Sequence, residues 1–423
     1  MTGPRLAEHF FRHEYGRLVA LLSRRVGLQH LESVEDAVQG ALLVALEAWS
    51  RAGAPDNPSG WLYRVAHNQL IGELRQTSRR LRLAEQHGAS MTEAVDDTPS
   101  IYLLADVRDD LLRMLFACCD DSIPVESQLV FALKTVCGFD VPEIAQRLFA
   151  TEAGVYKRLG RARSRLQELQ PRLDDLEPAA IAKRLPAVQA ILYLIFTEGH
   201  LSSHVSAPLR RELCDEAKRL TLLLAEHPLG GTPETFALMA LMHLHAARMA
   251  ARQDGAHELL LLEEQDRSFW DAGEMATGLS WLARSAQGST FSRYHAEAGI
   301  AAEHCLAPTL AQTRWDRIVE CYELLERVAP SDLHMLGKAL AVAECRGPEQ
   351  GLAVLEGFDP PVGLADSYLC HAVLADLHRR CGQVEAARRH GAAAIALAPS
   401  SAVRAALARR MGGDAGLAPR AGR

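Results

Sequence analysis

The stretch from Asp140 to Arg163 reads DVPEIAQRLFATEAGVYKRLGRAR, and it decides the fold of the chain around it. Pro142 falls in the first turn of a short helix, where its missing N–H is tolerated, and Thr151 is a favoured N-cap for a second helix. Two short helices joined by a tight connection at Phe149 and Ala150 predict a helix-turn-helix. The positions of its second helix that we expect to face inward are Val155, Leu159 and Ala162.

The second helix of this pair is basic. A helix fits the major groove of duplex DNA, where Arg and Lys bond to guanine edges or to phosphates. A solvated basic helix in an ordinary helical domain has the same composition, so the pattern leaves both interpretations open. The residues that we predict to contact DNA from this helix are Tyr156, Lys157, Arg158, Arg161 and Arg165.

The first 83 residues predict a compact domain of three helices. The spacing of apolar residues indicates helices over 6–27, 33–49 and 59–82, and Ser33 is the expected N-cap of the second. The segment 52–60 contains two prolines and two glycines, which predicts a loop.

Residues 84–103 are mostly polar and predict a flexible linker, and residues 104–172 form a second domain that ends in the helix-turn-helix. From 173 to 423, apolar spacing predicts helices joined by short turns. Near the end, a weak repeat of about 34 residues is close to tetratricopeptide spacing, with Gly382 at a turn and Pro399 closing the unit. The predicted fold class is all-α: two small helical domains plus a C-terminal helical, tetratricopeptide-like domain.

The charge distribution indicates more than the net charge of −7. Basic residues concentrate in two blocks, 75–82 and 157–165, with an acidic segment between them, which suggests two DNA-contacting surfaces. No run of 18 uncharged apolar residues occurs, and the first residues lack a signal-peptide core, so we expect a cytoplasmic protein with no membrane partner. The nine cysteines lack metal-ligand spacing, so we expect reduced core residues and no metal.

Trp61 to Asn68, WLYRVAHN, places two aromatic side chains and an amide just before the first basic block. Trp61 and Tyr63 can stack on unpaired bases, and Asn68 offers a donor and an acceptor to the edge of an extruded base. Both aromatic residues are also suited to a protein core, and the sequence leaves these alternatives open.

At this point the residues resemble a known family. SVEDAVQ at 33–39, DNPSG at 56–60 and WLYRVAHN at 61–68 closely resemble the first signature domain of extracytoplasmic-function (ECF) sigma factors of RNA polymerase. Residues 109–119 and the helix-turn-helix through Leu166 resemble the second. LPAVQAILYLIFTEG at 185–199 and LLLEEQDRSFWD at 260–271 are similar to segments of a subgroup with a C-terminal tetratricopeptide-like extension.

The resemblance implies sigma region 2 over 1–83, sigma region 4 over 104–172 and a regulatory extension over 173–423. It implies core RNA polymerase (β′ clamp helices and β flap) and promoter DNA as partners, no cofactor and no enzymatic activity. Asp36 and Gln39 match the surface that docks on the β′ clamp helices, and the helix-turn-helix residues match those that read the −35 element. The residues that match base capture and phosphate contacts at the −10 element are Asp56, Asn57, Ser59, Trp61, Tyr63, Asn68, Arg75, Arg79 and Arg80.

Two further clusters, both in the extension, allow other interpretations. Glu198, His200 and His204 have the spacing of some metal sites or of an ordinary polar helix face. A second cluster predicts a buried ion-pair network or a regulatory contact with the sigma domains or a signal ligand; it consists of Asp266, Arg267 and Trp270. The alternative functions are a helical-repeat scaffold with an incidental helix-turn-helix, and an enzyme housed in the extension.

Overall fold

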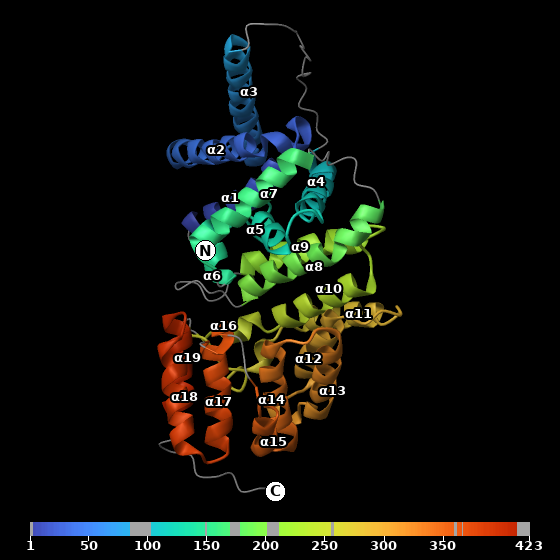
Figure 1. The fold of residues 1–423 in the computed structure, drawn as a ribbon, viewed down its shortest axis with the longest axis vertical. Helices are drawn as coiled ribbons and strands as arrows, with labels where there is room; N and C mark the ends of the chain where they lie inside the picture. The colour runs from blue at the N-terminus through green and yellow to red at the C-terminus, as the bar shows by residue number, and fades with distance from the viewer. Residues whose placement is uncertain are drawn as a thin grey trace. The chain divides into compact units, whose positions relative to one another are not determined.

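A computed structural model describes residues 3–84, 103–148, 150–169, 178–200, 211–254, 258–358, 362–365 and 367–412. Across these ranges the secondary structure is helical, and the only β feature is an isolated bridge between Gln253 and Leu259 (Figure 1). The predicted all-α class is confirmed. The chain divides into two compact units, Met1–Ile191 (unit 1) and Leu192–Arg423 (unit 2).

Unit 1 begins with the three predicted helices: α1 (Gly3–Val26), α2 (Leu31–Ala52) and α3 (Pro58–Ala84), with a 3-10 turn η1 (Leu28–His30) after α1. The expected N-cap at Ser33 is wrong, because α2 already starts at Leu31 and the Ser33 hydroxyl bonds to the Glu73 carboxylate of α3 at 3.2 Å. The three helices share a core that includes Val19, Leu22, Val34, Val38, Leu62 and Leu70.

The second half of unit 1 contains α4 (Leu103–Cys118), α5 (Val125–Thr135), α6 (Val141–Arg147) and α7 (Glu152–Leu169). A reciprocal capping box starts α6, in which the Glu143 N–H donates to Asp140 at 2.7 Å and the Asp140 N–H donates to Glu143 at 2.9 Å. The Thr151 hydroxyl caps α7 by accepting from the Gly154 N–H at 3.1 Å. The predicted helix pair is confirmed, although Phe149 in its connection lies outside the described residues.

Buried carboxylates join the two halves of unit 1. Glu35 of α2 accepts a hydrogen bond from the Thr135 hydroxyl of α5 at 2.8 Å and forms an ion pair with Arg163 of α7. Asp110 of α4 is paired with Arg24 of α1 at 2.8 Å. Helices more than 80 residues apart in the sequence are therefore held together by charge-assisted bonds.

Helix α8 (Pro178–His200) carries the boundary between the units. Among the described helices it is the one long and apolar enough to cross a membrane, by length and composition alone. Its apolar residues Ile191, Ile195 and Phe196 are buried, and the Phe196 carbonyl lies 3.5 Å from the Cys214 sulfur of the next helix. Burial of these side chains against other parts of the protein is typical of a core helix.

In unit 2, helices that follow one another in the sequence pack against each other. In the turn between Tyr368–Arg380 and Val384–Ala396, Gly382 has a φ of +73°, a backbone conformation that glycine adopts without strain, as its predicted turn position requires. The elements after α8 are α9 (Arg211–Glu226), α10 (Pro233–Ala246), η2 (Met249–Arg252), η3 (Arg267–Phe269), α11 (Ala272–Ser285), α12 (Arg293–Leu306), η4 (Leu310–Gln312), α13 (Trp315–Val328), α14 (Asp332–Arg346), α15 (Pro348–Ala353), α16 (Val362–Ala365), α17 (Tyr368–Arg380), α18 (Val384–Ala396) and α19 (Ser401–Gly412).

Candidate nucleic-acid and polymerase interfaces

The loop before α3 is organised by Asn57. Its side-chain oxygen accepts from the Gly60 N–H at 2.9 Å, and Pro58 occupies the first turn, so Asn57 caps the helix. Asp56 is exposed and Ser59 is half-buried. Asn57 therefore holds this loop at the start of α3.

One side of α3 carries the candidates for the first DNA surface. At 3.6 residues per turn, positions 61, 64, 68, 75 and 79 fall on the same side of the helix. Asn68, Arg75 and Arg79 are exposed there, while the side chain of Arg80 lies outside the described residues. The structure adds Arg64, which is exposed one turn before Asn68; its four-residue spacing from Asn68 was a signal that the sequence analysis missed.

The two aromatic candidates separate. The Trp61 ring is half-buried, 5.6 Å from Trp49, which in turn stacks on Phe11, so Trp61 belongs partly to the core. Tyr63 lies about 140° around the helix axis from position 68. It stacks on His67 at 5.7 Å under the guanidinium of Arg25. Tyr63 therefore lies on a different side of α3 from Asn68, and its role in stacking on unpaired bases stays a prediction.

Helix α2 exposes the polymerase-docking candidates Asp36 and Gln39 beside apolar residues. Leu43 and Leu46 follow at helical spacing on that side, and 65% and 49% of their surfaces are exposed. Sequence reasoning missed both leucines, although their spacing from Asp36 was visible. Gly40, in the same helix, lies beside the Gln69 side chain of α3, whose end would have to move to admit a Cβ at this position.

The recognition helix α7 has the predicted orientation, with Val155, Leu159 and Ala162 buried. Tyr156, with 61% of its surface exposed, lies on the opposite side with Lys157 and Arg161. The other two DNA candidates already face carboxylates: Arg158 is 3.6 Å from Glu126, and Arg165 is 2.6 Å from Glu168.

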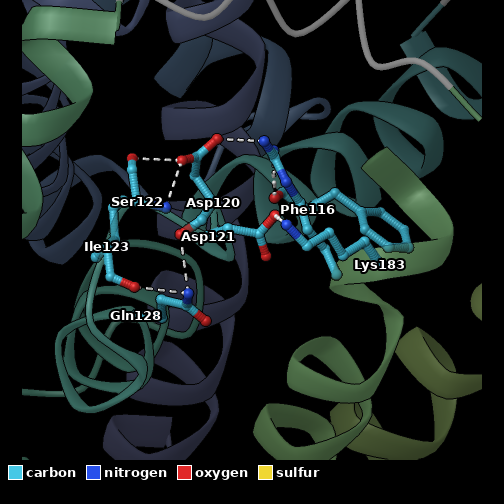
Figure 2. Close-up of polar contacts among 8 residues, drawn as sticks. Phe116, Asp120, Asp121, Ser122, Ile123, Gln128 and Lys183 are labelled. Carbon is cyan, nitrogen blue, oxygen red and sulfur yellow. Dashed lines mark hydrogen bonds and ion pairs between the residues drawn. The ribbon is translucent and has the colours of Figure 1, made fainter. Parts of the chain in front are cut away.

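The start of α8 is attached to the turn between α4 and α5 (Figure 2). The Arg184 guanidinium bonds to the Asp120 carboxylate and to the Phe116 carbonyl, the latter at 3.2 Å, and Lys183 pairs with Asp121 at 2.6 Å. The turn itself is braced, because the Gln128 amide donates to the carbonyls of Asp120 and Ile123.

Partial burial raises the pKa of the Asp120 carboxyl, but hydrogen bonds from Ser122 and the charge of Arg184 outweigh this effect, so its pKa lies below its ordinary value. The carboxylate is therefore stabilised in its charged form, as its pairing with Arg184 requires.

Asp266 and Arg267 of the extension do not pair with each other. Asp266 is exposed and caps η3 by accepting from the Ser268 N–H at 2.8 Å, while Arg267 donates to the carbonyls of His304 and Ala307. The predicted ion-pair network of Asp266 and Arg267 is therefore wrong. Trp270 is buried, with guanidinium groups over its ring from Arg267 at 4.5 Å and Arg248 at 5.1 Å.

The histidine pair cannot be compared as a whole, because His204 lies outside the described residues. His200 stacks on Phe196 at 5.8 Å and lies 4.8 Å from the ring of His245. Within the described ranges, no group of three or more His, Cys, Asp or Glu side chains could hold a metal ion. All nine cysteines are free; Cys345 is exposed, contrary to the expectation that all are core residues.

Comparison with known proteins agrees with this geometry. Residues 10–80 match the sigma-70 region 2 family, and residues 184–286 match a family of unknown function, DUF6596. The chain is 34% identical over 382 residues to the uncharacterized protein R00370 of Rhizobium meliloti, covering 88% of each chain. No solved structure gives a significant match.

Two shorter relatives match the first part of the chain. The RNA polymerase sigma factor YlaC of Bacillus subtilis is 26% identical over 161 residues, which are 38% of this chain and 90% of YlaC. The ECF RNA polymerase sigma factor SigM of Mycobacterium tuberculosis is 27% identical over 174 residues, which are 40% of this chain and 80% of SigM.

A region 2 domain followed by a helix-turn-helix defines an RNA polymerase sigma factor, a class of transcription initiation factor. The chain belongs to the ECF sigma factors that carry a C-terminal helical extension. Its similarity to R00370 extends over 88% of both chains.

Proposed function

We propose that the exposed side of α3 captures an unpaired base of the −10 element and that α7 reads the −35 element in duplex DNA. The observation that carries this proposal is the alignment of Asn68 with exposed cations on one side of α3. An amide can bond to the edge of an extruded base while guanidinium groups hold the phosphates beside it. These activities place the protein in the cytoplasm with core polymerase.

The test is Asn68→Ala in the full chain. Base capture offsets an unpairing cost of a few kcal/mol per base, so we expect open-complex formation at a cognate promoter to fall about tenfold or more, with unchanged binding to core polymerase. Permanganate footprinting measures the first and a pull-down the second. Gln69→Ala, at the neighbouring exposed position, is the matched control. Unchanged promoter melting in Asn68→Ala contradicts the assignment.

For polymerase docking we propose the surface of α2 formed by Asp36, Gln39, Leu43 and Leu46, with the β′ clamp helices as its partner and the β flap as the partner of region 4. Exposed leucines beside a carboxylate suit a protein partner, because binding removes their apolar surface from water. Leu43→Asp should weaken binding to core polymerase about tenfold or more. Loss of promoter melting with full polymerase binding in this variant contradicts the docking role.

We propose that the extension regulates the sigma domains through the attachment of α8 at Asp120. The Arg184 side chain is 12% exposed and that of Asp120 is 16% exposed, so this pair is partly shielded from water, whereas 69% of the adjacent Lys183 side chain is exposed. A shielded, hydrogen-bonded pair contributes more than an exposed one.

Promoter-specific transcription by Arg184→Gln, compared with Lys183→Gln, tests this route. We expect a several-fold change in the first variant, in either direction, and almost none in the second. Removal of residues 192–423 tests whether the extension regulates at all. If transcription stays at the wild-type level in the truncated protein, the regulatory proposal fails as a whole.

A further inference from the structure

Unit 2 has a partly open cavity of about 250 Å³ between the segment after η2 and helices α14, α17 and α19. Its wall is mostly aliphatic: Leu260 comes from the segment after η2, Leu340 from α14, Ala372 from α17 and Leu407 from α19. A concave apolar space with a few polar groups is the usual form of a small-molecule site.

Three charged side chains line this cavity: Arg252, Asp376 and Arg410. The Asp376 carboxylate is already bonded, by Arg379 at 2.9 Å and by Arg410 at 3.2 Å. Arg252 has no carboxylate partner among the described residues, and its one hydrogen bond is to the carbonyl of His200 at 2.5 Å. The uncompensated charge in the wall is therefore the positive charge of Arg252.

Arg248 adds a second positive charge near Arg252, and the carboxylate in the cavity wall, Asp376, is already paired with Arg379 and Arg410. Arg248 and Arg267 flank Trp270 nearby, and no described carboxylate forms an ion pair with either. The buried donor atoms Arg248 Nε, Arg267 Nη2 and Trp270 Nε1 have no acceptor in the described structure. Buried donors and cations are normally satisfied, so this region has an excess of donors over acceptors.

The pKa values of Arg252 and of its neighbour His245 agree with a positively charged site. Burial, and then the charge of Arg248, lower the pKa of Arg252 to about 10, which leaves it protonated at neutral pH. Burial and the same arginines lower the pKa of His245 to about 3, so this neighbouring imidazole is neutral. The arginines thus carry the positive charge of the cluster.

We propose that the cavity binds a small molecule with an apolar body and one oxyanionic group, a carboxylate or a phosphate, and that Arg252 binds this group. The aliphatic wall takes the apolar body, and the guanidinium forms charge-assisted hydrogen bonds with the oxygens. The ligand supplies the acceptors and the negative charge that the chain lacks at this place. Only the consequence of binding for transcription rests on the regulatory function proposed above.

Calorimetric titration of the full chain with four probes tests the chemistry of the ligand. Octanoate and octyl phosphate carry the two oxyanions, octylammonium reverses the charge, and inorganic phosphate lacks the apolar body. We expect both acids to bind and the other two probes to bind at least about tenfold more weakly, since a charge-assisted bond or the buried chain is lost. Failure of both acids to bind, or equal affinity for octylammonium or inorganic phosphate, overturns the proposal.

Two variants test the position of the site. Arg252→Met keeps an unbranched apolar stem and removes the charge, and should weaken binding of the acids about ten- to a hundredfold. Ala372→Phe fills the cavity and leaves Arg252 in place, and should also weaken binding. Arg346→Met, at an exposed arginine outside the cavity, should bind like the wild type. Circular dichroism checks folding; if Arg252→Met does not fold, Ala372→Phe decides, and unchanged binding in that variant overturns the proposal.

These titrations need no polymerase, so the two proposals fail separately. Binding with no effect of octanoate on promoter-specific transcription contradicts regulation through this ligand and leaves the ligand site standing. A regulatory effect of removing 192–423 without binding of either acid contradicts the ligand site alone.

Discussion

Charged side chains around Trp270 in unit 2 are arranged differently from those between the helices of unit 1. In unit 1, the buried carboxylates Glu35 and Asp110 each face an arginine from a helix far away in the sequence. In unit 2, Arg248 and Arg267 lie over the ring of Trp270 and pair with no carboxylate of the described chain, and Arg252 bonds to a carbonyl. Balanced charges hold helices together, whereas unbalanced ones leave bonding capacity for a group from outside the chain.

The largest expected effect comes from breaking the balance in unit 1. Arg163→Met removes the ion-pair partner of the buried Glu35 carboxylate, so we expect a loss of about 3 kcal/mol in the free energy of unfolding. Hydrogen exchange of the α2 and α7 amides measures it locally. Arg165→Met, two residues on and in an exposed pair with Glu168, should cost less than about 1 kcal/mol. Equal losses in both variants would show that the two halves are held together by other contacts.

A smaller effect should follow from acidification of unit 2. The folded pKa of His245 is about 3, below the ordinary histidine value of 6.5, because burial disfavours its charged form. The unfolded chain therefore takes up the proton first, and the stability that neutral His245 contributes above pH 6.5 is lost as the pH falls toward 3. At pH 5 the loss is at most about 2 kcal/mol.

His245→Phe should therefore unfold in urea like the wild type at pH 7 and be more stable than the wild type at pH 5. If both proteins lose the same free energy of unfolding between pH 7 and pH 5, His245 is not the group that titrates.

The smallest change in the free energy of unfolding is expected when unit 2 loses the guanidinium of Arg248. Arg248→Met removes a half-buried guanidinium whose only described hydrogen bond, to Gln265, is 3.5 Å long. The desolvation cost that disappears offsets the lost contact with Trp270, so we expect a change within about 1 kcal/mol of zero. Thermal unfolding followed by circular dichroism measures it. A loss as large as that of Arg163→Met would remove the contrast between the two units.

Much of the fold could be predicted from the sequence, since local signals act over one or two turns of helix. Pro142 and Thr151 mark the helix starts of the helix-turn-helix, and Gly382 marks a turn, because capping and backbone conformation depend on neighbouring residues. The N-cap at Ser33 failed because a distant partner, Glu73, takes the hydroxyl.

The sequence by itself thus determined the all-α class, the helix pair of α6 and α7, and the orientation of α7, because apolar spacing dictates which side of each helix is buried. Only the tertiary structure decided which charges meet. Glu35 faces Arg163 from 128 residues away, and Arg184 bonds to Asp120 from 64 residues away. The cavity at Arg252 has walls from segments separated by more than 100 residues. Such pairings depend on how helices pack in three dimensions, and no pattern along the chain records them.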